Sequence, residues 1–130
     1  MNLSEYFETN QGIGILATSD SKGTVNTAIY ARPHLLEGEN MLAFIMRNRH
    51  SYENLLSNPH ACYMFIKKGQ GYKGIRIYLT KIKEETDSEK INSISSKQCK
   101  KSLATEGEKR LLVSFKIDKT RPLIGDSSKA

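Results

Sequence analysis

The residues best suited to binding chemistry form one short segment, Arg47-Asn48-Arg49-His50-Ser51. The segment follows an apolar run and precedes a predicted helix, whose first turn would offer unpaired backbone amides and a partial positive charge. Two arginines and a serine hydroxyl add donors, and several donors converging on a small dianion are what a phosphate monoester requires. The segment therefore predicts a phosphate-binding site. A solvated basic turn, in which Ser51 only caps the helix, is the alternative.

A second motif, at residues 69–74, reads Gly-Gln-Gly-Tyr-Lys-Gly and matches the pattern GxGxxG. In dinucleotide-binding folds a helix follows this motif and directs its amino terminus at the pyrophosphate. Here the following residues alternate as in a strand, with Ile75, Ile77 and Leu79 on one face. The pattern therefore predicts a hairpin loop and argues against a Rossmann fold. The loop is either a mobile connection or a lid over a ligand.

Candidate catalytic and metal-binding groups are sparse. The three histidines, His34, His50 and His60, stand singly, and no nucleophile is paired with a base. Cys62 and Cys99 form no CxxC pair, so we expect two unpaired thiols and no metal site. If the protein performs chemistry, we expect a cofactor to supply it.

Length and composition fit one domain. The chain has 130 residues, 38% of them hydrophobic, and no stretch has the composition of a linker. We expect one domain over residues 1–125 and a disordered tail over 126–130. The sequence has no apolar run long enough for a membrane span, and its first residues lack a signal pattern, so we expect a cytoplasmic protein. The net charge of +6 fits a phosphorylated ligand, nucleic acid or simple solubility.

Short segments separated by turn residues predict a mainly β fold, a β-barrel or sandwich with a few short helices. Helices are expected over Asn2–Thr9, Ser51–Asn58 and Asp87–Leu103. Strands are expected over Gly12–Ser19, Thr24–Arg32, His34–Leu36, Met41–Met46, Ala61–Ile66, Gly74–Glu84 and Leu111–Ile117. In the second helix, Leu55 and Leu56 are expected to face inward. Arg32 would add a guanidinium to the phosphate site if its strand lies alongside.

Two of the expected strands have no polar face. Met41–Met46 and Ala61–Ile66 are apolar at nearly every position. A strand of this kind must be covered on both sides, and in so short a chain a partner subunit is the simplest second cover. The sequence therefore predicts a homodimer.

The order and spacing of several segments resemble the pyridoxamine 5′-phosphate oxidase-like FMN-binding proteins. These segments are Tyr30-Ala31-Arg32-Pro33-His34, Phe44-Ile45-Met46-Arg47-Asn48-Arg49, Asn54-Leu55-Leu56-Ser57-Asn58-Pro59 and Gly71-Tyr72-Lys73-Gly74. The resemblance runs from about Gly12 to Glu85, and it implies a split β-barrel that dimerises around two flavin mononucleotides. The lysine that many relatives carry before the Asn-Leu pair is missing, so phosphate binding would rest on the arginines. The chain is much shorter than true pyridoxamine phosphate oxidases, so their substrate is not carried over.

The resemblance also implies a role for each site residue. The isoalloxazine ring would lie along Tyr30, Ala31, Arg32 and Pro33. Backbone contacts to the ring would come from Ile45 and Met46. The ribityl chain and phosphate would be held by Arg47, Asn48, Arg49 and Ser51.

On this resemblance, we expect an FMN-binding protein, acting as a flavin-dependent oxidoreductase on an unidentified small substrate. Two alternatives stay open. One is a non-catalytic basic β-barrel that binds single-stranded nucleic acid, with Tyr63, Phe65, Tyr72 and Tyr78 as stacking candidates; the placement of most of these aromatics in apolar strands argues for packing instead. The other is the same split barrel holding haem or a deazaflavin.

Overall fold

The computed structural model describes residues 3–36, 40–47, 50–85 and 110–125. In these residues the chain forms the helices α1 (Leu3–Thr9) and α2 (His50–Ser57). It also forms the strands β1 (Gly12–Ser19), β2 (Val25–Ile29), β3 (His34–Leu36), β4 (Met41–Arg47), β5 (His60–Lys67), β6 (Gly74–Glu85) and β7 (Arg110–Pro122). None of the helices in the described residues has the length and hydrophobicity needed to span a lipid bilayer.

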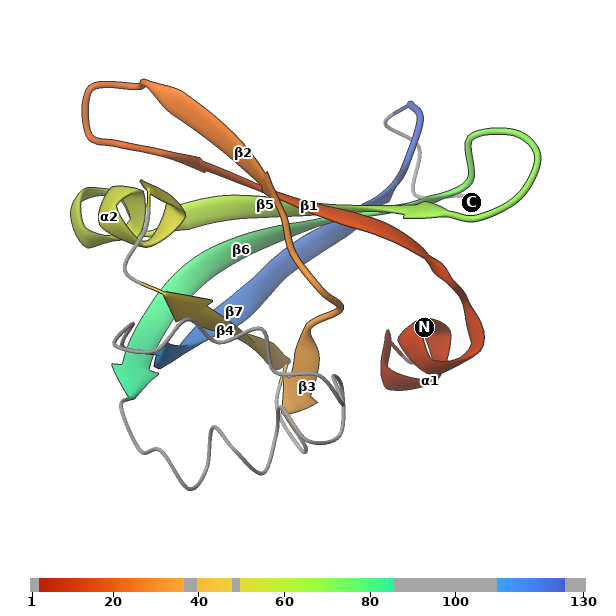
Figure 1. Ribbon diagram of the computed structural model, residues 1–130, viewed down its shortest axis with the longest axis horizontal. Coiled ribbons are helices and arrows are strands. Elements are labelled where there is room, and N and C mark those ends of the chain that lie inside the picture. The colour runs from red at the N-terminus through yellow and green to blue at the C-terminus, as the bar shows by residue number, and fades with distance from the viewer. Residues whose placement is uncertain (1–2, 37–39, 48–49, 86–109, 126–130) are drawn as a thin grey trace.

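The strands pair in one antiparallel sheet with the order β2-β1-β5-β6-β7-β4-β3. Figure 1 shows that this sheet curls strongly, with β1, β2 and β5 on one side, β3 and β4 on the other, and β6 and β7 running diagonally between them. The edge strands β2 and β3 are joined by a short crossover at residues 30–33. The predicted mainly β fold is confirmed.

The core lies inside the curled sheet and follows the predicted alternation. On β6, Ile75, Ile77 and Leu79 are all buried, as expected for one face of the strand. The matching face of β7 contributes Leu111, Val113, Phe115 and Ile117 to the same cluster. Removing such a side chain from water stabilises the fold by about 1.5–3 kcal/mol.

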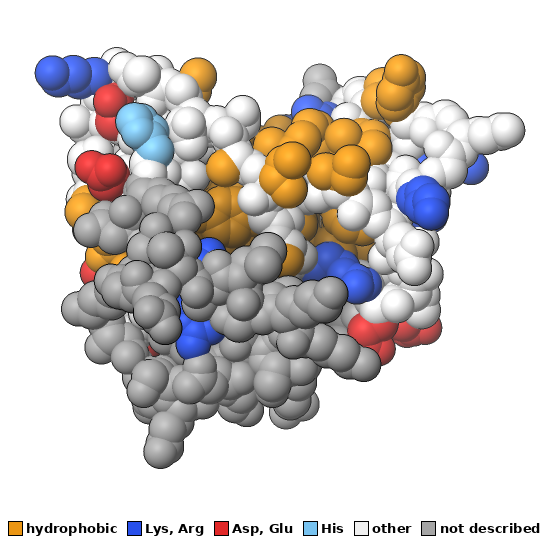
Figure 2. All heavy atoms as spheres, in the orientation of Figure 1, with side chains coloured by type: hydrophobic (Ala, Val, Ile, Leu, Met, Phe, Trp, Pro, Cys, Tyr) orange, Lys and Arg blue, Asp and Glu red, His pale blue; other side chains and the backbone are white. Residues whose placement is uncertain are grey.

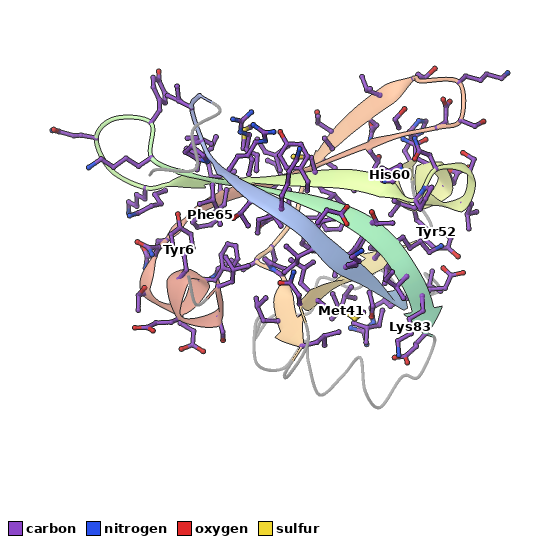
Figure 3. The ribbon with its side chains drawn as sticks, turned by 180° about the vertical axis from the view of Figure 1, so that it is seen from behind. Tyr6, Met41, Tyr52, His60, Phe65 and Lys83 are labelled. Carbon is purple, nitrogen blue, oxygen red and sulfur yellow. The ribbon has the colours of Figure 1, made fainter. Side chains whose placement is uncertain are left out.

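Aromatic rings make up much of this core. The rings of Phe7 and Phe65 meet edge to face, 5.1 Å apart, and the rings of Phe44 and Tyr63 are 5.0 Å apart. Figure 3 shows Tyr6 and Phe65 at the same end of the barrel, and their ring centroids are 6.0 Å apart. The helix α1 therefore covers the barrel end nearest to it with aromatic contacts.

The structure corrects two local predictions. The second strand ends at Ile29 and does not continue to Arg32, because the Tyr30 amide makes the last bond to β1 and the residues after it cross to β3. Leu55 is buried as predicted, but Leu56 is 61% exposed. Successive helix residues point about 100° apart, so in a short surface helix two neighbours do not both face the sheet. The predicted helix over residues 87–103 and the predicted tail over 126–130 lie outside the described residues.

The GxGxxG segment joins the antiparallel strands β5 and β6, as a hairpin loop should. The Lys67 amide donates to the Lys73 carbonyl at 2.7 Å and closes the loop, while the Lys68 amide donates to the Gln11 carbonyl at 2.7 Å. Gly71 adopts a φ of +79°, a conformation that residues other than glycine rarely adopt. The hairpin prediction is confirmed; a role as a lid stays a prediction.

Candidate functional site

Segments far apart in the sequence meet beside the crossover. β3 pairs with β4 through His34 and Ala43, so the crossover before His34 runs toward the carboxyl half of β4. The Tyr30 ring packs edge to face on Phe44 at 5.7 Å. The predicted ring-binding residues therefore lie next to the strand that ends in the predicted phosphate-binding segment.

Several contacts fix the backbone of the crossover. The Tyr30 amide donates to the Gly14 carbonyl at 3.0 Å. The Tyr63 hydroxyl lies 3.3 Å from the carbonyl oxygens of both Tyr30 and Ala31 and donates to them. Ala31 remains exposed to solvent and Pro33 is buried. An exposed segment of backbone is thus held in a defined shape, as a binding surface for a planar ligand requires.

Arg32 does not point at the predicted phosphate segment. Its guanidinium donates to the carbonyl of Phe7 and, at 3.5 Å, to the carbonyl of Asn10, at the end of α1. Arg32 was predicted to contribute to the phosphate site only if the second strand lies alongside that site. In the structure β2 pairs with β1 instead. In the structure Arg32 links the crossover to α1.

The carboxyl end of β4 places its residues on alternate faces. Met46 is 1% exposed and belongs to the core, whereas Ile45 and Arg47 lie on the opposite face and are half-buried. Arg47 pairs directly across the sheet with Arg110 on β7. Directly opposed residues of an antiparallel pair share a face and have neighbouring Cβ atoms. The side chains of Arg47 and Arg110 therefore leave the sheet from neighbouring positions on the same face.

Arg110 is a candidate that the sequence analysis missed. No local signal marks it, because its position beside Arg47 depends on the register between β4 and β7. Two neighbouring guanidinium groups can both donate hydrogen bonds to one bound dianion.

The first turn of α2 differs from the prediction by one residue. The helix begins at His50, so Ser51 lies inside the helix and is not its N-cap. The Ser51 side chain is buried, and its hydroxyl oxygen accepts a hydrogen bond from the Asn26 amide nitrogen Nδ2 at 3.2 Å. The buried Asn54 donates to the Thr18 hydroxyl at 3.0 Å. These bonds fix the start of α2 against β1 and β2.

Two predicted phosphate ligands, Asn48 and Arg49, lie outside the described residues. Arg47 and Arg110 are paired where β4 ends and β7 begins, and α2 starts three residues after Arg47; we call this end of the sheet the corner. In the described part of the chain, no group of three or more His, Cys, Asp or Glu side chains is arranged to hold a metal ion.

An apolar surface lies on the outer face of the sheet, on the strands next to this corner. Ile13, Val25 and Ile29 are 55%, 76% and 78% exposed. Ile13 pairs with Ile66, and Ile15 pairs with both Met64 and Ile29, so these side chains share one face of β1, β2 and β5. We call the set the outer apolar face: Ile13, Ile15, Val25, Ile29, Met64 and Ile66. Figure 2 shows hydrophobic side chains gathered over this region. Contiguous apolar surfaces of this kind mark interaction sites.

The aromatic side chains suggested for stacking on nucleic-acid bases divide into two groups. Tyr63 and Phe65 are 0% and 1% exposed and form part of the core, so they cannot receive bases. Tyr72 is exposed on the hairpin, and Tyr78 lies on the outer face with the Lys119 ammonium 5.0 Å from its ring. The stacking surface proposed for nucleic acid is therefore wrong at two of its residues.

Comparisons with known proteins show the fold. No protein-family model matches the chain, and no curated protein matches it with significance. Among solved structures, an FMN-binding protein from Syntrophomonas wolfei is similar at a TM-score of 0.75 and 20% identity, over 92% of this chain and 82% of that one. An F420 reductase is similar at a TM-score of 0.68 and 16% identity, over 89% and 94%. A candidate pyridoxamine 5′-phosphate oxidase from Lactobacillus delbrueckii is similar at a TM-score of 0.63 and 17% identity, over 89% and 87%. The fold is the split β-barrel of the pyridoxamine 5′-phosphate oxidase-like type, as the sequence resemblance implied.

Proposed function

We propose that the protein binds flavin mononucleotide at the interface of a homodimer and acts as a flavin-dependent oxidoreductase on a small substrate. The observation that carries the proposal is the contact of the shaped crossover with β4 at Phe44, three residues before Arg47. One segment suits a planar ring, and the strand that it contacts leads into a segment that suits a phosphate. The FMN-binding protein and the pyridoxamine phosphate oxidase candidate of the same fold support this choice.

The phosphate would be held at the corner formed by β4, β7 and α2. Arg47 and Arg110 supply guanidinium groups from adjacent strands, and Asn48 and Arg49 follow directly in the sequence. Ser51 accepts a hydrogen bond from Asn26, which leaves its hydroxyl hydrogen to donate. A guanidinium presents donors in a fixed fork that matches phosphate oxygens, so this donor set fits a phosphate monoester.

The ring would lie along the crossover. Tyr30, Ala31 and Pro33 form one wall, and the backbone at Ile45 and Met46 forms another. Arg32 fixes the crossover from behind through its bonds to the end of α1. The flavin, when bound, supplies the electron transfer; the chain binds it, orients it and excludes water from one side.

A second copy of the chain is proposed on the outer apolar face. Among the described residues this face is the largest set of exposed apolar side chains on adjoining strands. A twofold dimer brings the same face of both copies together, and burying large exposed residues such as Val25 and Ile29 stabilises the association by about 25 cal/mol for each Å² of apolar area removed from water. The edge strand β2 that leads into the crossover carries part of this face, so dimerisation and the site are linked through one strand.

A deazaflavin is the second candidate, favoured by the similarity to an F420 reductase. An absorption spectrum of freshly purified protein separates the two cofactors, because FMN and deazaflavins absorb at different wavelengths. We expect FMN to bind and to give a yellow protein. Bands of haem or of a deazaflavin in place of the flavin bands would reject FMN as the cofactor.

A double variant tests the phosphate site. Arg47→Ala combined with Arg49→Ala removes charge-assisted hydrogen bonds, each worth about 1.5–3 kcal/mol. The loss of one such bond lowers FMN affinity by about tenfold to a hundredfold, so the double variant should lose at least that much. Isothermal titration with FMN measures the change. Arg121→Ala, at the opposite end of β7, is the matched control and should bind like the unchanged protein. Unaltered FMN affinity in the double variant would show that the phosphate lies elsewhere.

A further inference from the structure

Features that are each locally unfavourable coincide behind the crossover. Gly14 lies inside β1 on the face that points to the core, where a glycine costs conformational entropy and packs nothing. Tyr63 is 0% exposed, and burial raises the pKa of its hydroxyl far above the ordinary tyrosine value. The ladder between β1 and β2 ends with the bond from the Tyr30 amide to the Gly14 carbonyl, although the sequence that follows can continue a strand. Departures from local rules that gather at one place indicate a site with a role beyond packing.

A single contact explains these features together. A Cβ atom added to Gly14 would lie 1.8 Å from the Tyr63 hydroxyl oxygen and 2.8 Å from the Tyr30 carbonyl oxygen. Both distances are too short for any side chain. The glycine therefore leaves a gap in β1 through which the Tyr63 hydroxyl, starting on β5, reaches the crossover.

The hydroxyl sets the backbone shape of the crossover. In a strand, successive carbonyl groups point to opposite sides. The carbonyl oxygens of Tyr30 and Ala31 are both 3.3 Å from the Tyr63 hydroxyl, so they point to the same atom. A backbone with this arrangement has left strand geometry, and the ladder with β1 does not continue past the Tyr30 amide.

The Tyr63 ring itself is held rigidly. It lies 5.0 Å from the Phe44 ring and 6.2 Å from the Phe7 ring, within the aromatic core. A rigid ring gives its hydroxyl a fixed position, and a phenylalanine at this place would keep the ring contacts while losing only the hydroxyl.

We propose that Tyr63 and Gly14 are positioning residues for the flavin ring: the Tyr63 hydroxyl, admitted by the gap at Gly14, holds the Tyr30–Ala31 backbone in the shape that receives the isoalloxazine. This inference rests on the proposed function. It assigns a role at the site to residues that touch no predicted ligand, and it separates Tyr63 from the other core aromatics.

The test compares Tyr63→Phe with Tyr78→Phe, which removes a hydroxyl from the outer face. Both variants are titrated with FMN and then studied at saturating FMN by visible absorption and by redox titration of the flavin. We expect Tyr63→Phe to bind FMN about fivefold more weakly, the value of one neutral hydrogen bond, and to shift the flavin bands and midpoint potential. Tyr78→Phe should match the unchanged protein. A residue that only stabilised the fold would leave the spectrum and potential of the saturated protein unaltered, and that result would overturn the inference.

Amide hydrogen exchange of the free protein gives a second measurement that does not depend on the flavin. In Tyr63→Phe, exchange should accelerate at Tyr30, whose amide donates to the Gly14 carbonyl, while β6 and β7 keep their protection. Uniform acceleration over the whole barrel, or no change at the crossover, would contradict the role of the hydroxyl. If the unchanged protein binds no FMN, the proposed function fails; if it binds FMN and Tyr63→Phe behaves identically, only the positioning role fails.

Discussion

β4 and β5 have nearly the same apolar composition but different surroundings. In β4, Leu42, Ala43, Phe44 and Met46 are all at most 2% exposed, so both faces of the strand are largely covered within one protomer. In β5, only alternate residues, from Ala61 through Tyr63 to Phe65, are buried, and the residues between them remain partly exposed. β4 lies between β7 and β3, where Ala43 and Leu112 form a second small core with Ile45. The outer side of β5 continues instead into the exposed apolar residues of β1 and β2.

The difference teaches what an apolar run can and cannot predict. A strand without a polar face indicates that both faces need cover, but it does not indicate what provides the cover. For β4 the protomer supplies it, so the expectation that this strand needs a partner subunit is wrong. For β5 the second face is only partly covered, and the dimer proposal now depends on that face alone.

Placing a charge on the second face of β4 should have the largest effect. Ala43→Lys puts an ammonium group at a position that is 0% exposed, and burying an unpaired charge together with the added volume costs more than about 4 kcal/mol. We expect a protein that is largely unfolded, measured by urea denaturation followed by circular dichroism. A folded Ala43→Lys variant with a normal midpoint of urea denaturation would mean that the second face of β4 is not covered within the protomer.

The same change on β5 should separate the subunits and leave the protomer folded. Met64→Lys places a charge on the outer apolar face, where the half-exposed side chain reaches water in a monomer but is buried in the proposed dimer. The dimer dissociation constant should rise by about a hundredfold or more, measured by sedimentation equilibrium. Leu56→Lys, at an exposed position on α2, is the control and should remain dimeric. A dimeric Met64→Lys variant would place the interface elsewhere.

Arg110 allows a smaller and more local test of the β4 side. Arg110→Gln keeps the length and polarity of the side chain but removes its charge, so FMN should bind about tenfold more weakly, the lower value of one charge-assisted hydrogen bond. The thermal unfolding temperature of the FMN-free protein is measured beside it, to separate a loss of binding from a loss of stability. A fall in unfolding temperature without any loss of FMN affinity would assign Arg110 to structure alone.

The alkylation rate of the Cys62 thiol measures how accessible the second face of β5 is. The expected change in this rate is the smallest of the predicted effects. Burial raises the pKa of its thiol, against a smaller lowering by Arg76. The thiolate is the reactive form, so in a Cys99→Ser background the pH of half-maximal alkylation rate should lie above the ordinary thiol pKa of about 8.5. Met64→Lys should accelerate alkylation severalfold at any one pH by exposing this face. A rate that is half-maximal at or below about pH 8.5 would indicate an exposed, ordinary thiol.

Features that depend on local alternation were predictable from the sequence. The core face of β6 follows from Ile75, Ile77 and Leu79, because a strand repeats every two residues. The hairpin at Gly69–Gly74 follows from its glycines and from the strand pattern after it. The resemblance also predicted the split β-barrel, because the order and spacing of its segments follow the order of the strands in that fold.

Features that depend on contacts between distant segments were not predictable in this way. The crossover is bonded by Tyr63, which is far away in sequence, and the pairing of Arg47 with Arg110 is set by sheet register. The direction of Arg32 depends on where α1 packs. One signal was available: Gly14 interrupts an apolar strand, and such a glycine often marks a close approach of other atoms.

The crossover at residues 30–33 joins the two edges of the sheet directly. Because an extended residue spans at most about 3.5 Å, the steps from Ile29 to His34 allow these edges a separation of no more than roughly 17 Å. The chain therefore carries a short tether across its own opening. Covalent geometry limits the width of the gap between β2 and β3. The barrel therefore cannot open further to admit a bulky molecule unless β2 or β3 first separates from its neighbouring strand.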